Sequence, residues 1–68
     1  MGEMPDYLKR VVEERDQLHE RLVKLRAFLN STAFTQIDEA EQRRLNLQAT
    51  YMTDYERVLN ERLGAATR

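Results

Sequence analysis

The chain has 68 residues, enough for one domain, and a domain of this size buries only about 60% of the surface that its unfolded chain exposes. It contains no cysteine and one histidine, which excludes disulfides, thiolate metal sites and a multi-histidine site within one chain. Lys and Arg total 11 and Asp and Glu total 12, so the formal charge of −1 is not that of a general nucleic-acid-binding protein. We therefore expect oligomerisation to stabilise the small core.

Residues 5–30 are predicted to form the first helix. Pro5 suits its first turn, and Asp6 suits the positive end of the helix dipole. Positions spaced alternately three and four residues apart lie on one narrow stripe of a helix, as in a coiled coil. Those positions are Leu8, Val11, Arg15, Leu18, Leu22, Leu25 and Leu29.

Arg15 is the one charge on this stripe, and a buried cation is costly unless it is paired. We expect it to set the register, to pair with a glutamate such as Glu56, or to hold an anion in a central cavity. His19 lies beside the stripe and is interpreted as an interface residue.

Residues 31–37 are predicted to connect the two helices. The sequence Asn30-Ser31-Thr32 favours turns, because these side chains compete for backbone hydrogen bonds. Phe34 and Ile37 are too apolar for a solvated loop, and we expect them to fold back over the end of the helix pair.

A second helix is predicted from about residue 38 to 63, with Asp38 as its N-cap, Gly64 as the residue that ends it, and residues 64–68 as a frayed tail. It carries two apolar stripes. The first is Leu45, Ala49, Met52, Leu59 and Leu63, and the second is Leu47, Tyr51, Tyr55 and Val58. One partner helix covers about one stripe. We therefore predict an all-α, two-helix antiparallel hairpin that forms a homo-oligomer, most simply a dimeric four-helix bundle.

The tyrosines allow two interpretations. They are either subunit-interface anchors or aromatic surfaces that, with nearby arginines, bind a flat anionic ligand. In the second interpretation Tyr51, Tyr55, Arg57 and Arg62 form the site, and Tyr7 and Arg10 close it from the start of the first helix. No nucleophile, carboxylate pair or ligand cluster at a telling spacing indicates catalysis, so we predict no catalytic residue, no metal and no cofactor.

Four segments recur in the same order in a group of short, uncharacterised phage and prophage helical-hairpin proteins, which the chain resembles over residues 7–63. They are Arg10-Val11-Val12-Glu13-Glu14, Lys24-Leu25-Arg26-Ala27-Phe28-Leu29, Glu39-Ala40-Glu41-Gln42 and Met52-Thr53-Asp54-Tyr55. The resemblance implies a phage accessory protein and carries over no catalytic residue. In architecture alone the chain is also similar to phage sponge proteins that sequester cyclic nucleotides of bacterial immunity.

These observations predict a non-enzymatic phage protein that acts by binding in the host bacterial cytoplasm. The first hypothesis is antagonism of a host defence protein. The alternatives are a cyclic-nucleotide sponge, which traps the ligand between subunits, and a virion assembly factor. The chain has no apolar run long enough to cross a membrane, and we expect neither membrane nor nucleic-acid binding.

Overall fold

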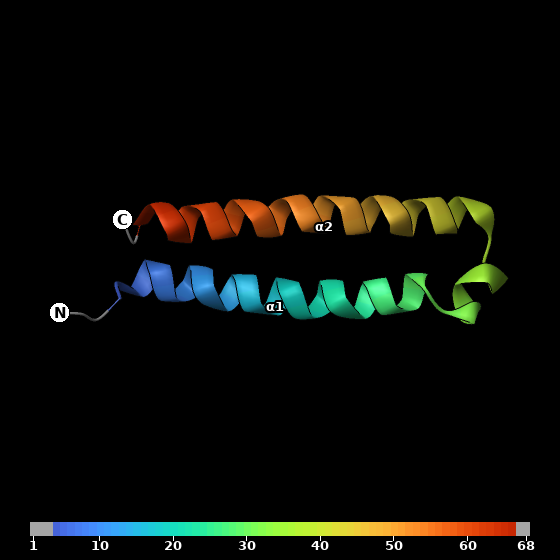
Figure 1. The fold of residues 1–68 in the computed structure, drawn as a ribbon, viewed down its shortest axis with the longest axis horizontal. Helices are drawn as coiled ribbons and strands as arrows, with labels where there is room; N and C mark the ends of the chain where they lie inside the picture. The colour runs from blue at the N-terminus through green and yellow to red at the C-terminus, as the bar shows by residue number, and fades with distance from the viewer. Residues whose placement is uncertain (1–3, 67–68) are drawn as a thin grey trace.

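The computed structural model describes residues 4–66 as two long helices joined by a short turn (Figure 1). Helix α1 spans Asp6–Leu29, the 3-10 helix η1 spans Thr32–Gln36, and helix α2 spans Glu39–Ala66. The two long helices run antiparallel, with η1 at one end and the start of α1 beside the end of α2 at the other, in a rod of 52 × 14 × 14 Å. The predicted all-α hairpin is confirmed over this part of the chain, which contains no strand.

The stripe predicted on α1 faces α2. Leu8, Val11, Leu18 and Leu22 are buried, while the stripe's other members are half-buried. At its start, the backbone carbonyl of Pro5 accepts hydrogen bonds from the N–H groups of Leu8 and Lys9. These two hydrogen bonds hold the first turn of α1, and the apolar stripe that follows faces α2.

The core is small and unevenly distributed along the rod. Within residues 4–66 it consists of six buried residues, of which Leu22 and Leu59 are fully buried. Leu8 and Val11 pack with Leu59 and Leu63 near the chain ends. Near the turn, Leu25, Leu29 and Leu45 are only half-buried. Because each fully buried leucine contributes about 1.5–3 kcal/mol, few side chains carry most of the hairpin's stability.

Side chains of the turn close the hairpin, as predicted for Phe34. The rings of Phe28 and Phe34 meet edge to face, with their centroids 6.0 Å apart. The Gln42 side chain donates to the backbone carbonyls of Phe34 (3.0 Å) and Ile37 (3.1 Å), which ties the start of α2 to η1. The Ser31 hydroxyl donates to the Phe28 carbonyl at 2.6 Å. The Phe28 and Phe34 carbonyls also accept hydrogen bonds from the backbone N–H groups of Ser31 (3.0 Å) and Ile37 (3.4 Å), so these side chains reinforce a turn that the backbone already closes.

Helix α2 begins as predicted and ends later than predicted. Asp38 Oδ2 accepts a hydrogen bond from the Ala40 backbone N–H at 3.0 Å. The expectation that Gly64 ends the helix is wrong, because α2 continues through Gly64 to Ala66. Leu63, which is buried against the core, holds this last turn in place, and a helical glycine costs only about 1 kcal/mol relative to alanine. Of the predicted tail, residues 67–68 lie outside the described part.

Candidate ligand-binding groove on helix α2

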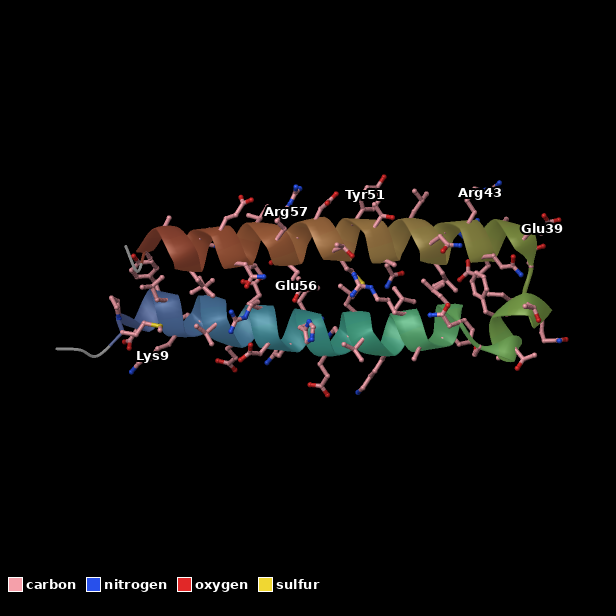
Figure 2. The ribbon with its side chains drawn as sticks, viewed as in Figure 1. Lys9, Glu39, Arg43, Tyr51, Glu56 and Arg57 are labelled. Carbon is pink, nitrogen blue, oxygen red and sulfur yellow. The ribbon has the colours of Figure 1, made fainter. Side chains whose placement is uncertain are left out.

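The two helices are joined along one edge by polar side chains, and we call this row the polar edge. It consists of three interhelical contacts: Arg15 Nη1 to Asn60 Oδ1 (3.2 Å), His19 Nδ1 to Glu56 Oε2 (2.8 Å) and Arg26 Nη2 to Thr53 Oγ1 (2.8 Å). Figure 2 shows Glu56 pointing toward α1. The expected pairing of Arg15 with Glu56 is wrong, because Glu56 lies at the level of His19, one turn further along α1.

Each nitrogen of the Arg15 guanidinium donates one hydrogen bond within the chain. Its guanidinium also donates to Asp16 Oδ1 at 3.1 and 3.2 Å, and its side chain is one-third exposed. It therefore lies at the margin of the helix pair, where a cation stays partly hydrated. In this hairpin Arg15 joins the two helices and does not line an enclosed anion cavity.

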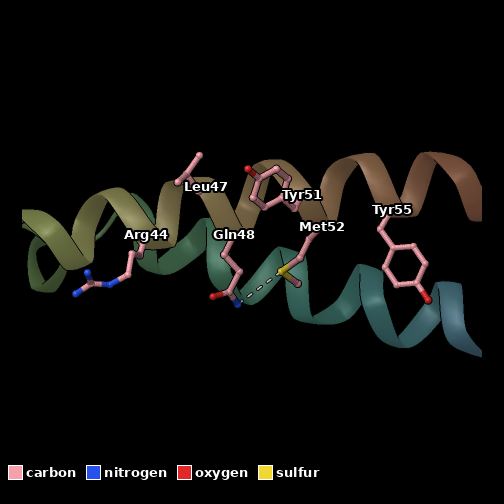
Figure 3. A pocket seen from close by; sticks show the side chains of 6 residues that line it. All are labelled: Arg44, Leu47, Gln48, Tyr51, Met52 and Tyr55. Carbon is pink, nitrogen blue, oxygen red and sulfur yellow. Dashed lines mark hydrogen bonds between the residues drawn. The ribbon is translucent and has the colours of Figure 1, made fainter.

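A shallow groove of about 380 Å³ lies on α2 (Figure 3). All of its lining residues come from α2: Arg44, Leu47, Gln48, Tyr51, Met52 and Tyr55. Their spacing of three or four residues gathers them on one side of the helix. Gln48 Nε2 lies 3.8 Å from Met52 Sδ, a contact that joins two lining side chains. The result is a mostly apolar surface with two phenol rings and one guanidinium.

The groove is open to solvent because α1 covers a different side of α2. Tyr51 is 65% exposed and Tyr55 is 45% exposed, and Leu47 and Val58 are similarly exposed. Figure 2 shows Tyr51 pointing away from α1. An apolar stripe of this kind, exposed on a chain with so small a core, is typical of a binding surface.

The structure separates residues that the sequence analysis grouped together. Arg57 lies off the groove: it lines a second, polar pocket with Thr53, Glu56, Asn60 and Glu61, and its guanidinium pairs with Asp54 at 3.3 Å. Two residues along a helix rotate a side chain by about 200°, which separates Arg57 from Tyr55.

Arg62 falls on the same side of α2 as the tyrosines, seven residues after Tyr55. Tyr7 and Arg10 are exposed at the start of α1, which lies beside the end of α2 (Figure 1). They do not line the groove.

Sequence reasoning missed Arg44 and Gln48 as groove residues. Arg44 pairs locally, because its Nε donates to Glu41 Oε1 at 2.8 Å. The signal that identifies it is its spacing of seven residues from Tyr51, which places both side chains on one stripe.

Among residues 4–66, no group of three or more His, Asp or Glu side chains is arranged to hold a metal ion. Neither α1 nor α2 is long and apolar enough to cross a membrane.

The fold and the groove define a class: small helical hairpins with an exposed aromatic surface on one helix. Within this class the chain belongs to the Sequestin family, whose model matches residues 5–65. The family's name is compatible with a sequestering, binding role. Neither the curated proteins nor the solved structures include a significant match to this chain.

Proposed function

We propose that this protein sequesters a flat anionic ligand of the cyclic-nucleotide class, holding its bases against the aromatic groove of α2. The observation that carries the proposal is the pair of exposed tyrosines, Tyr51 and Tyr55, which line one groove one helical turn apart. The family name supports the sequestering role, and the resemblance to short phage proteins supports a phage protein acting in the host bacterial cytoplasm.

Aromatic rings suit this ligand because every base presents a flat π-face. Stacking of a base on an aromatic side chain contributes about 1–3 kcal/mol per base. Tyr51 and Tyr55 supply two such rings, and Leu47 and Met52 extend the apolar surface around them. The hydroxyl group of each tyrosine also offers a hydrogen bond to the ligand's polar edges.

Arg44 provides the positive charge that a phosphate needs. Only its Nε is used by the hydrogen bond to Glu41, and within the described residues neither Nη atom of Arg44 has a partner. A guanidinium with two adjacent free donors can contact a phosphate in a bidentate way. Arg44 thus replaces Arg57 as the phosphate-binding arginine of the groove.

A protein ligand is the second candidate, and it is favoured by the length of the exposed stripe. Leu47, Tyr51, Tyr55 and Val58 extend over three turns of α2, as do the apolar anchors of helices that dock onto another protein. In this alternative the chain antagonises a host defence protein. Virion assembly remains a prediction from the sequence.

Thermal unfolding in the presence of a panel of cyclic di- and trinucleotides tests the proposal. We expect at least one of them to raise the midpoint, because a ligand that binds only the folded state stabilises it. Arg44→Ala should remove the shift, whereas Arg57→Ala should keep it.

These two arginines form a matched pair. Each side chain is 66% exposed, and each pairs with an acid three residues earlier on α2. If no nucleotide moves the midpoint, the cyclic-nucleotide proposal is wrong and the exposed stripe is a protein-binding surface. Loss of the shift in both variants would place the anion site elsewhere.

A further inference from the structure

A carboxylate stands beside the charged residue of the groove. Among the six lining residues, Arg44 alone carries a charge, and Figure 3 shows it at one end of the row. Glu41, about one turn earlier on α2, does not line the groove, but its Oε1 accepts a hydrogen bond from Arg44 Nε at 2.8 Å. The Glu41 side chain is 48% exposed. Any anion that Arg44 binds is therefore held next to a negative charge of the protein.

The hydrogen bond with Glu41 divides the guanidinium of Arg44 into an occupied side and a free side. A guanidinium is a planar fork of five N–H donors. Glu41 takes the Nε side, and no protein atom among residues 4–66 bonds to either Nη. The two Nη groups can hold one phosphate through two of its oxygens. Glu41 thus fixes the side of the fork on which a phosphate binds.

A phosphate on the free side stays close to the Glu41 carboxylate, because a single guanidinium separates them. Two anions bonded to opposite sides of one guanidinium lie roughly 6–7 Å apart. At that distance in water of low ionic strength, the repulsion between two unit charges weakens binding about two- to threefold. A phosphate with two negative charges meets this repulsion twice, so its binding is weakened about four- to ninefold.

Nucleotides differ in the charge that each phosphate carries. A phosphodiester, as in a cyclic nucleotide, carries one negative charge, whereas a terminal phosphate carries about 1.5 to 2 at pH 7. An arginine alone favours the terminal phosphate, because its attraction grows with the charge of the ligand. A carboxylate beside the arginine opposes this preference, because its repulsion grows in the same way.

We propose that Glu41 is a charge-selectivity residue of the groove, which disfavours linear nucleotides with a terminal phosphate relative to cyclic nucleotides. Glu41 acts through Arg44: it bonds to the Nε side, offsets the positive charge and leaves the Nη side to a singly charged phosphodiester. This inference rests on the proposed function, because it places a nucleotide phosphate at Arg44. It adds a means by which the groove discriminates against linear nucleotides.

A second acid–arginine pair on α2 provides an internal control. Asp54 Oδ1 bonds to Arg57 Nη2 at 3.3 Å, again with a spacing of three residues, and both arginine side chains are 66% exposed. Asp54 follows Arg44 by ten residues, which is about 15 Å of helix, so salt screens its effect on a phosphate at Arg44. Removal of the Asp54 charge should therefore have little effect on the groove.

Titration with linear AMP and cyclic AMP tests the proposal, because the two ligands share their base and sugar and differ in phosphate charge. We would measure both Kd values at low ionic strength and about pH 8, where the terminal phosphate is doubly charged. In Glu41→Gln the side chain still accepts a hydrogen bond but is uncharged. We expect this variant to bind cyclic AMP about two- to threefold and linear AMP about four- to ninefold more tightly than the natural chain. The preference for cyclic AMP thus falls about two- to threefold.

Three further measurements separate the charge of Glu41 from its effect on structure. Asp54→Asn should leave both Kd values within about 1.5-fold of the natural chain, because its charge is distant from Arg44. An ionic strength of about 0.5 M should largely remove the effect of Glu41→Gln, because the Debye length falls to about 4 Å. Glu41→Ala, which also removes the hydrogen bond that orients Arg44, should bind both ligands more weakly than Glu41→Gln. Circular dichroism checks that each variant is helical.

The comparison of Glu41→Gln with the natural chain can overturn this inference alone. If cyclic nucleotides bind the natural chain and the preference for cyclic AMP is unchanged in Glu41→Gln, Glu41 does not select by charge and the proposed function stands. An equal change in Asp54→Asn would also overturn the inference, because it would mean that only the total charge of the chain matters.

A pair of flat anions that are not nucleotides decides the role of Glu41 if no nucleotide binds. Naphthalene sulfonate carries one charge and naphthyl phosphate about two at this pH, and both offer an aromatic ring to the tyrosines. If only these probes bind, the proposed function fails. A rise of about two- to threefold in the relative affinity for naphthyl phosphate in Glu41→Gln then supports the role of Glu41, and an unchanged ratio overturns it. If neither probe binds, Arg44 holds no anion and both proposals are wrong.

Discussion

Helix α2 carries two apolar stripes that meet different surroundings: we call the one that faces α1 the inner stripe, and the one formed by Leu47, Tyr51, Tyr55 and Val58 the outer stripe. Leu59, on the inner stripe, is fully buried, whereas Leu47, on the outer stripe, is 48% exposed. The hairpin therefore needs only one of the two stripes for its own core. Burial of the first stripe explains the fold, and the second stripe is available for binding. Substitutions on the two stripes should accordingly affect different properties.

The largest effect is expected where a charge enters the stripe of α1 that packs against the inner stripe of α2. Leu22 is fully buried, and Leu22→Asp places a carboxylate among apolar side chains with no partner, at a cost of several kcal/mol. We expect the chain to lose its helical circular dichroism signal at 25 °C. Glu20→Ala, on the solvent side, should change the free energy of unfolding by no more than about 0.5 kcal/mol. A folded Leu22→Asp variant would show that the buried stripe of α1 is not part of the core.

A matched pair of leucines compares the two stripes directly. Leu59→Ala should lower the free energy of unfolding by about 2–5 kcal/mol, because it leaves a cavity in the core. Leu47→Ala removes the same atoms from a half-exposed site and should cost the hairpin about 1 kcal/mol or less. Urea unfolding of both variants, at a concentration where the chain is monomeric, measures the difference. Equal losses would indicate that the outer stripe, too, is buried on folding.

Gly64 lies on neither stripe and tests whether the last turn of α2 is helical. A methyl group at this position meets no atom within 4 Å, so Gly64→Ala gains helix propensity without a clash. We expect the free energy of unfolding to rise by about 0.5–1 kcal/mol. A decrease would indicate that the helix ends before this residue, as the sequence first suggested.

The polar edge should contribute least to stability. His19 and Glu56 are 2.8 Å apart, but the histidine side chain is 57% exposed and its hydrogen bond competes with water. His19→Ala should therefore cost about 0.2–1 kcal/mol. Chemical denaturation checks this value. Lys24→Ala is the control, because it removes an exposed ion pair with Glu20 that lies within α1 and does not join the helices. A loss above about 2 kcal/mol would mean that the polar edge, rather than the inner stripe, holds the helices together.

The heptad spacing of the first helix was enough to predict the hairpin, because it specifies which stripe must be covered. The same spacing does not specify how far one helix is shifted along the other. That shift decides that Glu56 meets His19 instead of Arg15. Arg57 was grouped with Tyr55 because the two are close in sequence, although rotation about the helix separates them. Gly64 was expected to end α2, but the burial of Leu63 outweighs the glycine's local preference.

The Gln42 side chain, which bonds to two carbonyls of the turn, also has a consequence for the order of folding events. It closes a loop between residues eight or fewer positions apart, so this contact costs little chain entropy. The pairing of Leu8 and Val11 with Leu59 and Leu63 instead joins the two ends of the chain. We expect the turn to be structured in the folding transition state and the chain ends to close afterwards. Gln42→Ala should then slow refolding, whereas Leu63→Ala should chiefly accelerate unfolding.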